Sequence, residues 1–330
     1  MLANWGLVGH QWAVALLKVQ MVNGKVRQAY LFTGPDGAGR RTLALRLAQA
    51  LNCTRPPASG EFCGECRNCR GFATMQHADL LILERQEGDR EIKVAALREL
   101  TRSISRTPLE AKIQVALLLD FHEASEEAAN AMLKTLEEPN PSVLICITAP
   151  DADSLPATVV SRCELIRLRP LAIAALASEL EGRLHIDQPH ATLLASLSEG
   201  LPGGAIRMQS NPKELEQRSR WLDDGEDLLK ADRVQRFEFA EKAGKDRDTL
   251  NAQLRTWLSF WRDVLLRAGG SNGAISNLDR AERIDRLAAQ LPFSAIHRFV
   301  TCLERTLDQL VTNVNARLAM EVLLLELPSL

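Results

Sequence analysis

Short apolar runs alternate with helix-like segments along the first 170 residues of the chain. The runs are almost unbroken and comprise Tyr30–Thr33, Leu80–Leu83, Val115–Asp120, Val143–Thr148 and Leu165–Leu168. Strands that are apolar on both faces are typical of a parallel sheet with helices on either side. The pattern therefore predicts an α/β domain over residues 1–170.

The remainder of the chain follows helical periodicity. A compact helical stretch at about 171–208 ends in SEGLPGGA, whose glycines and proline stop a helix. Farther on, apolar residues recur on single helix faces. The first face comprises Leu254, Trp257, Leu258, Trp261, Val264 and Leu265, and the second comprises Phe299, Val300, Leu303, Leu307, Leu310, Val311, Val314 and Leu318. We expect a small helical domain over 171–208 and an all-α bundle over 209–330, whose apolar stripes suit either its own core or contact with other subunits.

The composition is that of an ordinary soluble globular protein. The chain has 330 residues, of which 25% are charged and 46% apolar, and its net charge is −2. Such a small charge creates no strong field for nucleic acid, so any DNA contact would come from a local patch or from partner chains. We find no signal-peptide pattern and no apolar run long enough for a membrane span, so we expect a cytoplasmic location.

Four of the seven cysteines crowd into residues 53–69, at Cys53, Cys63, Cys66 and Cys69. Two-residue gaps let neighbouring thiolates turn toward one ion, and four thiolates complete the tetrahedral shell of zinc. The surrounding FCGECRNCRG is polar and glycine-rich, unlike a core segment. Because protein would fill all four positions, the zinc is expected to be structural. An iron–sulfur cluster is the alternative, although the fourth ferredoxin cysteine, which precedes a proline, is absent.

The stretch GPDGAGRRT, residues 34–42, has the outline of a loop that cradles nucleotide phosphates between a strand and a helix. Its candidate nucleotide-binding residues are Gly34, Gly37, Gly39, Arg40, Arg41 and Thr42. Arg40 stands where the phosphate-binding lysine belongs, and Arg41 stands where a hydroxyl would bind magnesium. Thr42 comes one residue late, so on a helix it points about 100° away.

The second acidic element of such sites reads LLLDFHE, residues 117–123. Asp120 ends an apolar strand, where an aspartate that orients magnesium belongs, but Phe121 takes the place of the water-activating glutamate. Defects on both sides of one pocket predict that the chain does not hydrolyse ATP. They leave weak nucleotide binding open, and a plain strand–turn–helix without nucleotide is the other alternative.

Three stretches together resemble the bacterial DNA polymerase III clamp loader, an AAA+ family: AYLFTGPDGAGRRTLALRLAQALNC, CGECRNC and NAMLKTLEEPNPSVLICITAPDADSLPATVVSRCELIRLRPL. The motifs LKTLEEP and SRC behind a zinc knuckle make the match specific over about residues 1–210. Beyond it the chain agrees mainly in helical character and in NARLAMEVLLLEL. The resemblance implies an AAA+ parallel-sheet domain with a zinc knuckle, a small helical lid and a C-terminal helical collar for oligomerisation.

The family has two close branches: an ATPase motor subunit, called gamma or tau, and a stator subunit that has usually lost its own ATP site. The altered phosphate loop favours the stator branch. The motor's lid usually carries an ATP-sensing arginine, whose place here falls at Gly203 in EGLPGGA. An active motor ATPase is the alternative within the family, since Arg40 keeps a positive charge.

The resemblance gives Arg162, in the SRC motif of residues 161–163, a role outside its own subunit. In the family this arginine points into the ATP site of a neighbouring subunit, where charge develops on the γ-phosphoryl group during transfer. A surface salt bridge is the alternative role for Arg162. Ser161 and Cys163 are expected to set the local turn and packing.

The LKTLEEP segment, residues 133–139, is expected to end a helix that closes at Pro139. A proline interrupts helical hydrogen bonding. Leu133 and Leu136 would face the core, and the resemblance implies that Glu137 and Glu138 lie near a subunit interface.

Members of the family form a five-subunit ring fragment that opens a sliding clamp and places it on primed DNA during replication. The resemblance therefore implies the motor subunits and a clamp-opening delta subunit as partners. The sliding clamp and DNA would be reached through the assembly, in the cytoplasm at the replisome. ATP would lie between subunits, so this chain would be a component of the DNA polymerase III holoenzyme without ATPase activity of its own.

Two hypotheses from other functional classes are weaker. A zinc-containing nucleic-acid-binding module is disfavoured by an aromatic content of 5%, a single tyrosine and the near-neutral charge. A metabolic P-loop kinase would need the missing lysine and hydroxyl, and none of the six histidines pairs with a carboxylate at an interpretable spacing.

Overall fold

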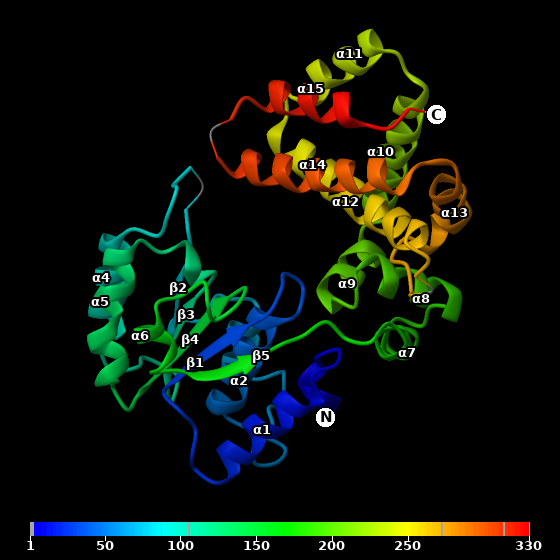
Figure 1. Cartoon of the computed structure of the whole chain (residues 1–330). Helices are drawn as coiled ribbons and strands as arrows, with labels where there is room; N and C mark the ends of the chain where they lie inside the picture. The colour runs from blue at the N-terminus through cyan, green and yellow to red at the C-terminus, as the bar shows by residue number, and fades with distance from the viewer. Residues whose placement is uncertain (1–2, 87, 105, 272, 313, 330) are drawn as a thin grey trace. The chain divides into compact units, whose positions relative to one another are not determined.

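The computed structural model describes residues 3–86, 88–104, 106–271, 273–312 and 314–329. The chain forms two compact units (Figure 1). The sheet unit comprises Met1–Leu184 and Leu201–Gly204, and the helical unit comprises His185–Gly200 and Ala205–Leu330. The three-domain division predicted at residues 170 and 208 stays a prediction.

A five-stranded parallel sheet forms the centre of the sheet unit. Its strands are β1 (Ala29–Thr33), β2 (Leu80–Leu83), β3 (Gln114–Leu118), β4 (Val143–Ala149) and β5 (Glu164–Arg167). They lie in the order β2-β3-β4-β1-β5, and every adjacent pair is parallel. The α/β prediction is confirmed, and each predicted apolar run coincides with a strand to within one or two residues.

Helices cover both faces of this sheet (Figure 1). One face packs against α1 (Gln11–Val22), α2 (Arg40–Asn52) and α3 (Arg67–Ala73), and the other against α4 (Val94–Ile104), α5 (Glu126–Glu137) and α6 (Ala157–Val160). The unit also contains η1 (Ala3–Gly6), η2 (Phe121–Glu123) and α7 (Ile173–Leu184). The carboxyl ends of the parallel strands meet at one edge, where open α/β sheets place their ligands.

Alternate residues of the buried strands face opposite helix layers. Tyr30 and Phe32 pack in the same core as Leu43 and Leu47 of α2, whereas Leu31 belongs to the core on the other face. A strand has a period of two, so an unbroken apolar run is buried on both faces only when helices cover both sides.

The helical unit is all-α, as predicted. Its helices are α8 (Gln188–Leu197), α10 (Pro212–Lys230), α11 (Arg233–Ala243), α12 (Arg247–Ala268), α13 (Ala281–Gln290), α14 (Phe293–Val311) and α15 (Ala316–Glu326), with a short η3 (Leu278–Arg280). The apolar faces of α12 and α14 meet in its core, where the rings of Trp261 and Phe299 lie 4.9 Å apart. Across the described stretches, we find no helix that is both long and apolar enough to cross a membrane.

One predicted helix face is wrong at its end. The apolar series was expected to run through Val314 to Leu318, but α14 ends before Val314 and a separate helix, α15, follows. Asn315 starts α15, because its side chain accepts hydrogen bonds from backbone N–H groups of the first turn. Val314 and Leu318 are exposed as a result, at 37% and 55%.

The glycines and proline of residues 200–204 end one helix and begin another. α8 ends at Leu197, and Glu199 and Gly200 follow with left-handed backbone conformations. Pro202 then opens α9 (Pro202–Ser210), since a proline suits the first turn of a helix. From the sequence only the stop was expected. The first residues of α9, through Gly204, belong to the sheet unit.

Candidate functional site

The phosphate loop joins β1 to α2 at the carboxyl edge of the sheet. Its first residue, Gly34, directs its N–H toward the carbonyl oxygens of Ala149 (3.3 Å) and Pro150 (3.0 Å) at the end of β4. Gly34 has a φ of 148°, and a Cβ there would lie 2.3 Å from the carbonyl oxygen of Leu168. Only glycine fits such a position, so the tight turn of the phosphate-binding motif is kept.

The chain itself closes this loop. The N–H of Gly203, in the first turn of α9, donates a 2.8 Å hydrogen bond to the carbonyl oxygen of Gly37. A Cβ on Gly203 would lie 2.9 Å from the Cα of Gly37, which is well inside the normal separation of two carbon atoms. Any side chain at position 203 would have to displace the loop, so an ATP-sensing arginine has no room there.

Arg40 is held by ion pairs within the chain. Its side chain is only 8% exposed and contacts the carboxylates of Asp36 and Asp120, with 3.1 Å between Nη1 and Oδ1 of Asp120. Asp120, the candidate magnesium ligand, therefore already has a cationic partner. A nucleotide that used either residue would first have to break this pair.

Asp120 and the start of α2 complete the loop region. Asp120 has a left-handed backbone with φ of 45°, and its N–H donates a 2.8 Å hydrogen bond to the hydroxyl of Thr148 near the end of β4. Gly39 is the N-cap of α2. Arg41 and Thr42 are exposed, and within the described part of the chain neither side chain makes a hydrogen bond or an ion pair. The structure thus gathers the glycines, Arg40 and Asp120, and leaves Arg41 and Thr42 outside.

Arg162 lies just after α6 and presents its guanidinium group at the surface. Its Nη1 donates a 2.7 Å hydrogen bond to the carbonyl oxygen of Thr158, one helical turn earlier. Its Nη2 lies 2.5 Å from Oε1 of Glu137, the last residue of α5. The Arg162 side chain is 32% exposed. The pairing with Glu137 joins residues far apart in the sequence, and no spacing signal predicted it.

The two neighbours of Arg162 have structural contacts. The hydroxyl of Ser161 donates a 3.2 Å hydrogen bond to the carbonyl oxygen of Thr158, which supports the turn after α6. Cys163 packs against the core on the α4 and α5 side of the sheet. Burial raises the pKa of the Cys163 thiol to about 12, so it stays protonated at neutral pH. These contacts fit the expected roles in the turn and in packing.

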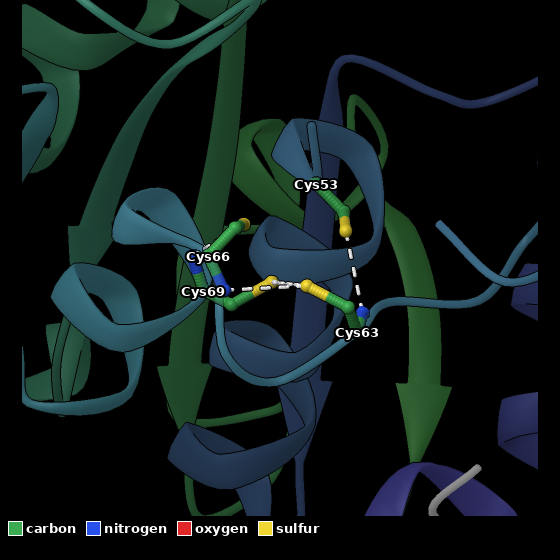
Figure 2. A group of neighbouring side chains, drawn as sticks. All are labelled: Cys53, Cys63, Cys66 and Cys69. Carbon is green, nitrogen blue, oxygen red and sulfur yellow. Dashed lines mark hydrogen bonds between the residues drawn. The ribbon is translucent and has the colours of Figure 1, made fainter. Parts of the chain in front are cut away.

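Figure 2 shows Cys53, Cys63, Cys66 and Cys69 directed toward one another. Their sulfur atoms all lie within 4.8 Å of each other, and Cys63 and Cys69 are 3.9 Å apart. Four sulfurs bound to one zinc at about 2.3 Å would be separated by about 3.8 Å, so the set has the size of a tetrahedral metal site. All seven cysteines are free thiols, which leaves these four available as ligands.

Backbone N–H groups within the knuckle point at its sulfur atoms. Cys63 donates to the sulfur of Cys53 at 3.3 Å, Cys66 to that of Cys63 at 3.3 Å, and Cys69 to that of Cys66 at 3.4 Å. At Cys66, burial favours the thiol, but hydrogen bonds from Thr54 and Cys69 outweigh it and lower the pKa to about 6. The fold therefore favours the thiolate, the form that binds metal, at this position.

A buried polar network links the knuckle to the sheet. Asn68 of α3 lies 3.2 Å from the ring of His77, which accepts a 3.0 Å hydrogen bond from the N–H of Asp79. The Asp79 carboxylate in turn accepts three 2.7 Å hydrogen bonds from the backbone N–H groups of residues 109–111. These bonds outweigh the effect of burial and lower the pKa of Asp79. Nothing in the sequence predicted this network, because its members follow no local pattern.

Two protein-family models match the chain. The first, "DNA polymerase III, delta subunit", matches residues 9–172. The second, "DNA polymerase III, delta subunit, C terminal", matches residues 213–328. The two matches together include most of the sheet unit and most of the helical unit.

Individual relatives agree with these models. The chain is 34% identical to the DNA polymerase III subunit delta′ of Pseudomonas aeruginosa, over 67% of each chain. It is 28% identical to the DNA polymerase III subunit delta′ of Bacillus subtilis, over 94% of each chain. It is also 32% identical to the DNA polymerase III subunit tau of Escherichia coli, over 59% of this chain but only 30% of tau.

Proposed function

Because the chain belongs to the family of DNA polymerase III delta′ subunits, which are clamp-loader subunits, we propose that it completes the ATP site of a neighbour and hydrolyses no ATP itself. In this proposal the chain acts as the stator of the assembly, with tau- or gamma-type motor subunits and a delta subunit as its partners. The sliding clamp and primed DNA are reached through the complex, in the cytoplasm.

The closed phosphate loop is the observation that carries this proposal. The pairing of Arg40 with Asp120 uses groups that a nucleotide would need, and the 2.8 Å hydrogen bond from Gly203 to Gly37 holds the start of α9 against the loop. Asp120 would not be free to bind magnesium. The γ-phosphate would have no lysine, because Arg40 replaces it, and no sensing arginine, because Gly203 replaces it. A motor ATPase needs all of these groups, so the motor alternative is disfavoured.

Arg162 has the properties needed to act on a neighbour's triphosphate. Its guanidinium is a planar cation with a fork of N–H donors, and it is exposed enough to be reached by another subunit. As the γ-phosphoryl group is transferred, negative charge spreads over its oxygens, and a cation placed there lowers the barrier. Arginines supplied in this way accelerate transfer by about 10³- to 10⁵-fold.

Arg162→Ala in the reconstituted clamp loader tests the proposal. The readout is the pre-steady-state burst of phosphate after ATP, clamp and primed DNA are mixed, because each ATP site contributes its own share. We expect one site's share to leave the burst and to reappear at a rate about 10³-fold lower. Assembly, followed by gel filtration, is the control, because a complex that fails to form would lose the burst at every site.

Two results would count against the proposal. A burst of full amplitude and normal rate with Arg162→Ala would remove the role of the arginine in the neighbour's site. Stoichiometric MgATP binding by the isolated wild-type chain, measured by calorimetry, would show that the loop is open to nucleotide.

We also propose that the four cysteines hold one structural zinc ion. Their sulfur spacing fits a tetrahedral site, and all four positions are taken by protein, which leaves no open place for a catalytic water. Zinc bound there would supply folding free energy to residues 53–69, on the order of 10 kcal/mol.

Metal analysis of the purified chain tests the zinc proposal. We expect one zinc per chain, lost in Cys66→Ser and retained in Cys302→Ser, which changes a thiol outside the cluster. Chelation should lower the melting temperature of the sheet unit. Iron with a visible charge-transfer spectrum would instead support the iron–sulfur alternative.

A further inference from the structure

The contact between Arg162 and Glu137 has a consequence for how the arginine is presented. Arg162 is fixed at two points, by the carbonyl oxygen of Thr158 at 2.7 Å and by the carboxylate of Glu137 at 2.5 Å. The first contact comes from α6 and the second from the end of α5, so two elements hold one flat group. A long arginine side chain held only by its own helix would keep far more rotational freedom.

The place of Glu137 is electrostatically unfavourable without its partner. Glu137 is the last residue of α5, and the carboxyl end of a helix carries a partial negative charge that disfavours acidic side chains. Glu138, the next residue, is equally acidic, and no ion pair or hydrogen bond of its side chain falls within the described residues. Of these two adjacent acids, only Glu137 is aligned with the SRC segment.

Donors remain on Arg162 after both contacts are made. A guanidinium group has five N–H donors. The Nη1 group faces Thr158 and, more distantly, Ser161 at 3.4 Å, while one N–H of Nη2 faces Glu137. Nε and the second N–H of Nη2 have no partner among the described residues, and the side chain is partly exposed. An incoming phosphate can therefore bind while the two contacts persist.

We propose that Glu137 is a positioning residue that holds the Arg162 guanidinium in the orientation in which it reaches a neighbour's triphosphate. This inference rests on the proposed function of Arg162. The carboxylate does not touch the nucleotide. It acts by reducing the freedom that Arg162 must lose when phosphoryl transfer begins, and a group positioned before the reaction stabilises the transition state more effectively.

Glu137→Ala and its neighbour Glu138→Ala form a matched pair for the test. Both remove one surface carboxylate at the end of the same helix, but only Glu137 contacts Arg162. In the reconstituted complex, we expect Glu137→Ala to slow the burst phase of the neighbouring ATP site about three- to tenfold. The ATP concentration that half-saturates this phase should stay the same, because the loss is in orientation and not in ground-state binding. Glu138→Ala should behave as wild type.

Two further variants separate positioning from a structural role. Glu137→Gln keeps an acceptor oxygen at the same place and should restore most of the rate. Combined with Arg162→Ala, the Glu137→Ala change should cause no further slowing, since its effect passes entirely through the arginine. A lower melting temperature with an unchanged burst rate would indicate a purely structural ion pair and overturn the inference.

The outcomes also distinguish this inference from the proposed function. If Arg162→Ala slows the neighbouring site but Glu137→Ala leaves it unchanged or faster, the finger stands and the positioning role is lost. A faster rate would mean that the carboxylate restrains the arginine. If Arg162→Ala has no effect, the proposed function itself fails.

Discussion

Arg40 and Arg162 carry the same guanidinium group and both pair with carboxylates, yet the fold treats them in opposite ways. Arg40, at the start of α2, is 8% exposed and contacts Asp36 and Asp120. Arg162 is 32% exposed, and two of its donors have no partner in the described chain. Arg40 is therefore buried and paired with carboxylates of its own chain, whereas Arg162 is partly exposed and has donors that an anion could reach.

The comparison shows that charge alone does not define a phosphate site. A cation stabilises a developing negative charge only if it has donors to spare when the ligand arrives. The Arg40 region keeps the strand, the glycines and the helix of a nucleotide loop, but its polar groups already bind one another. In the proposed function, the Arg162 region depends on a neighbour to supply the triphosphate.

Replacing either Arg40 or Arg162 by lysine is expected to separate the two arginines most clearly. Lysine keeps the charge but cannot make the forked contacts with Thr158 and Glu137. We expect Arg162→Lys to slow the neighbouring ATP site about ten- to hundredfold. Arg40→Lys should change the burst rate of the complex by less than about twofold, because the Arg40 guanidinium is buried and pairs with carboxylates of its own chain. Equal losses at both positions would mean that the loop also takes part in the reaction.

Substituting alanine for Gly203 tests how closely the start of α9 packs against the phosphate loop. Gly203→Ala places a Cβ 2.9 Å from the Cα of Gly37, and we expect it to lower the unfolding free energy by about 1 to 3 kcal/mol. Gly182→Ala is the control, since no atom lies within 4 Å of its added Cβ. Because glycine destabilises a helix interior, Gly182→Ala should raise the unfolding free energy by up to about 1 kcal/mol. Urea denaturation measures both, and similar stabilisation by both changes would argue against close contact at Gly203.

Substituting Cys163 tests whether Arg162 is the residue of the SRC segment on which the ATPase burst depends. Cys163→Ala should cost less than about 1.5 kcal/mol and leave the burst rate unchanged, because the side chain packs and contacts no anion. Its pKa is raised to about 12, above that of an ordinary thiol, so the protonated form is favoured in the fold. Alkylation of Cys163 should therefore be slow at pH 8 and accelerate only as the pH rises toward that value. Rapid labelling at pH 8 would contradict the half-buried placement of the thiol.

Rebuilding the phosphate motif is expected to have the smallest effect. Arg40→Lys combined with Arg41→Thr restores the lysine and hydroxyl of a working loop. We still expect no MgATP binding in calorimetry at concentrations up to about 1 mM, because the start of α9 remains packed against the loop at Gly37. Tight binding by the double variant would show that only these two side chains separate this loop from an active one.

The sequence alone determined the strands, the cysteine cluster and the loss of the phosphate-binding lysine. Each is a local feature: an apolar run marks a doubly covered strand, and a two-residue gap lets neighbouring thiolates meet. Arg162 became a candidate for a neighbour's ATP site from the short SRC motif and from the resemblance to the clamp-loader family. Helix ends follow less clearly from local patterns. The break before Asn315 was missed because the apolar period continues across it.

Only the tertiary structure decided which groups Arg40 and Arg162 contact. Gly203 and Gly37 are separated by most of the sheet unit in sequence, and Glu137 and Arg162 lie on different helical segments, so neither contact has a local pattern. The same holds for Asp79 and the backbone of residues 109–111. A sequence shows which groups are charged, but whether a charge is already neutralised depends on which distant group the fold brings within about 3 Å.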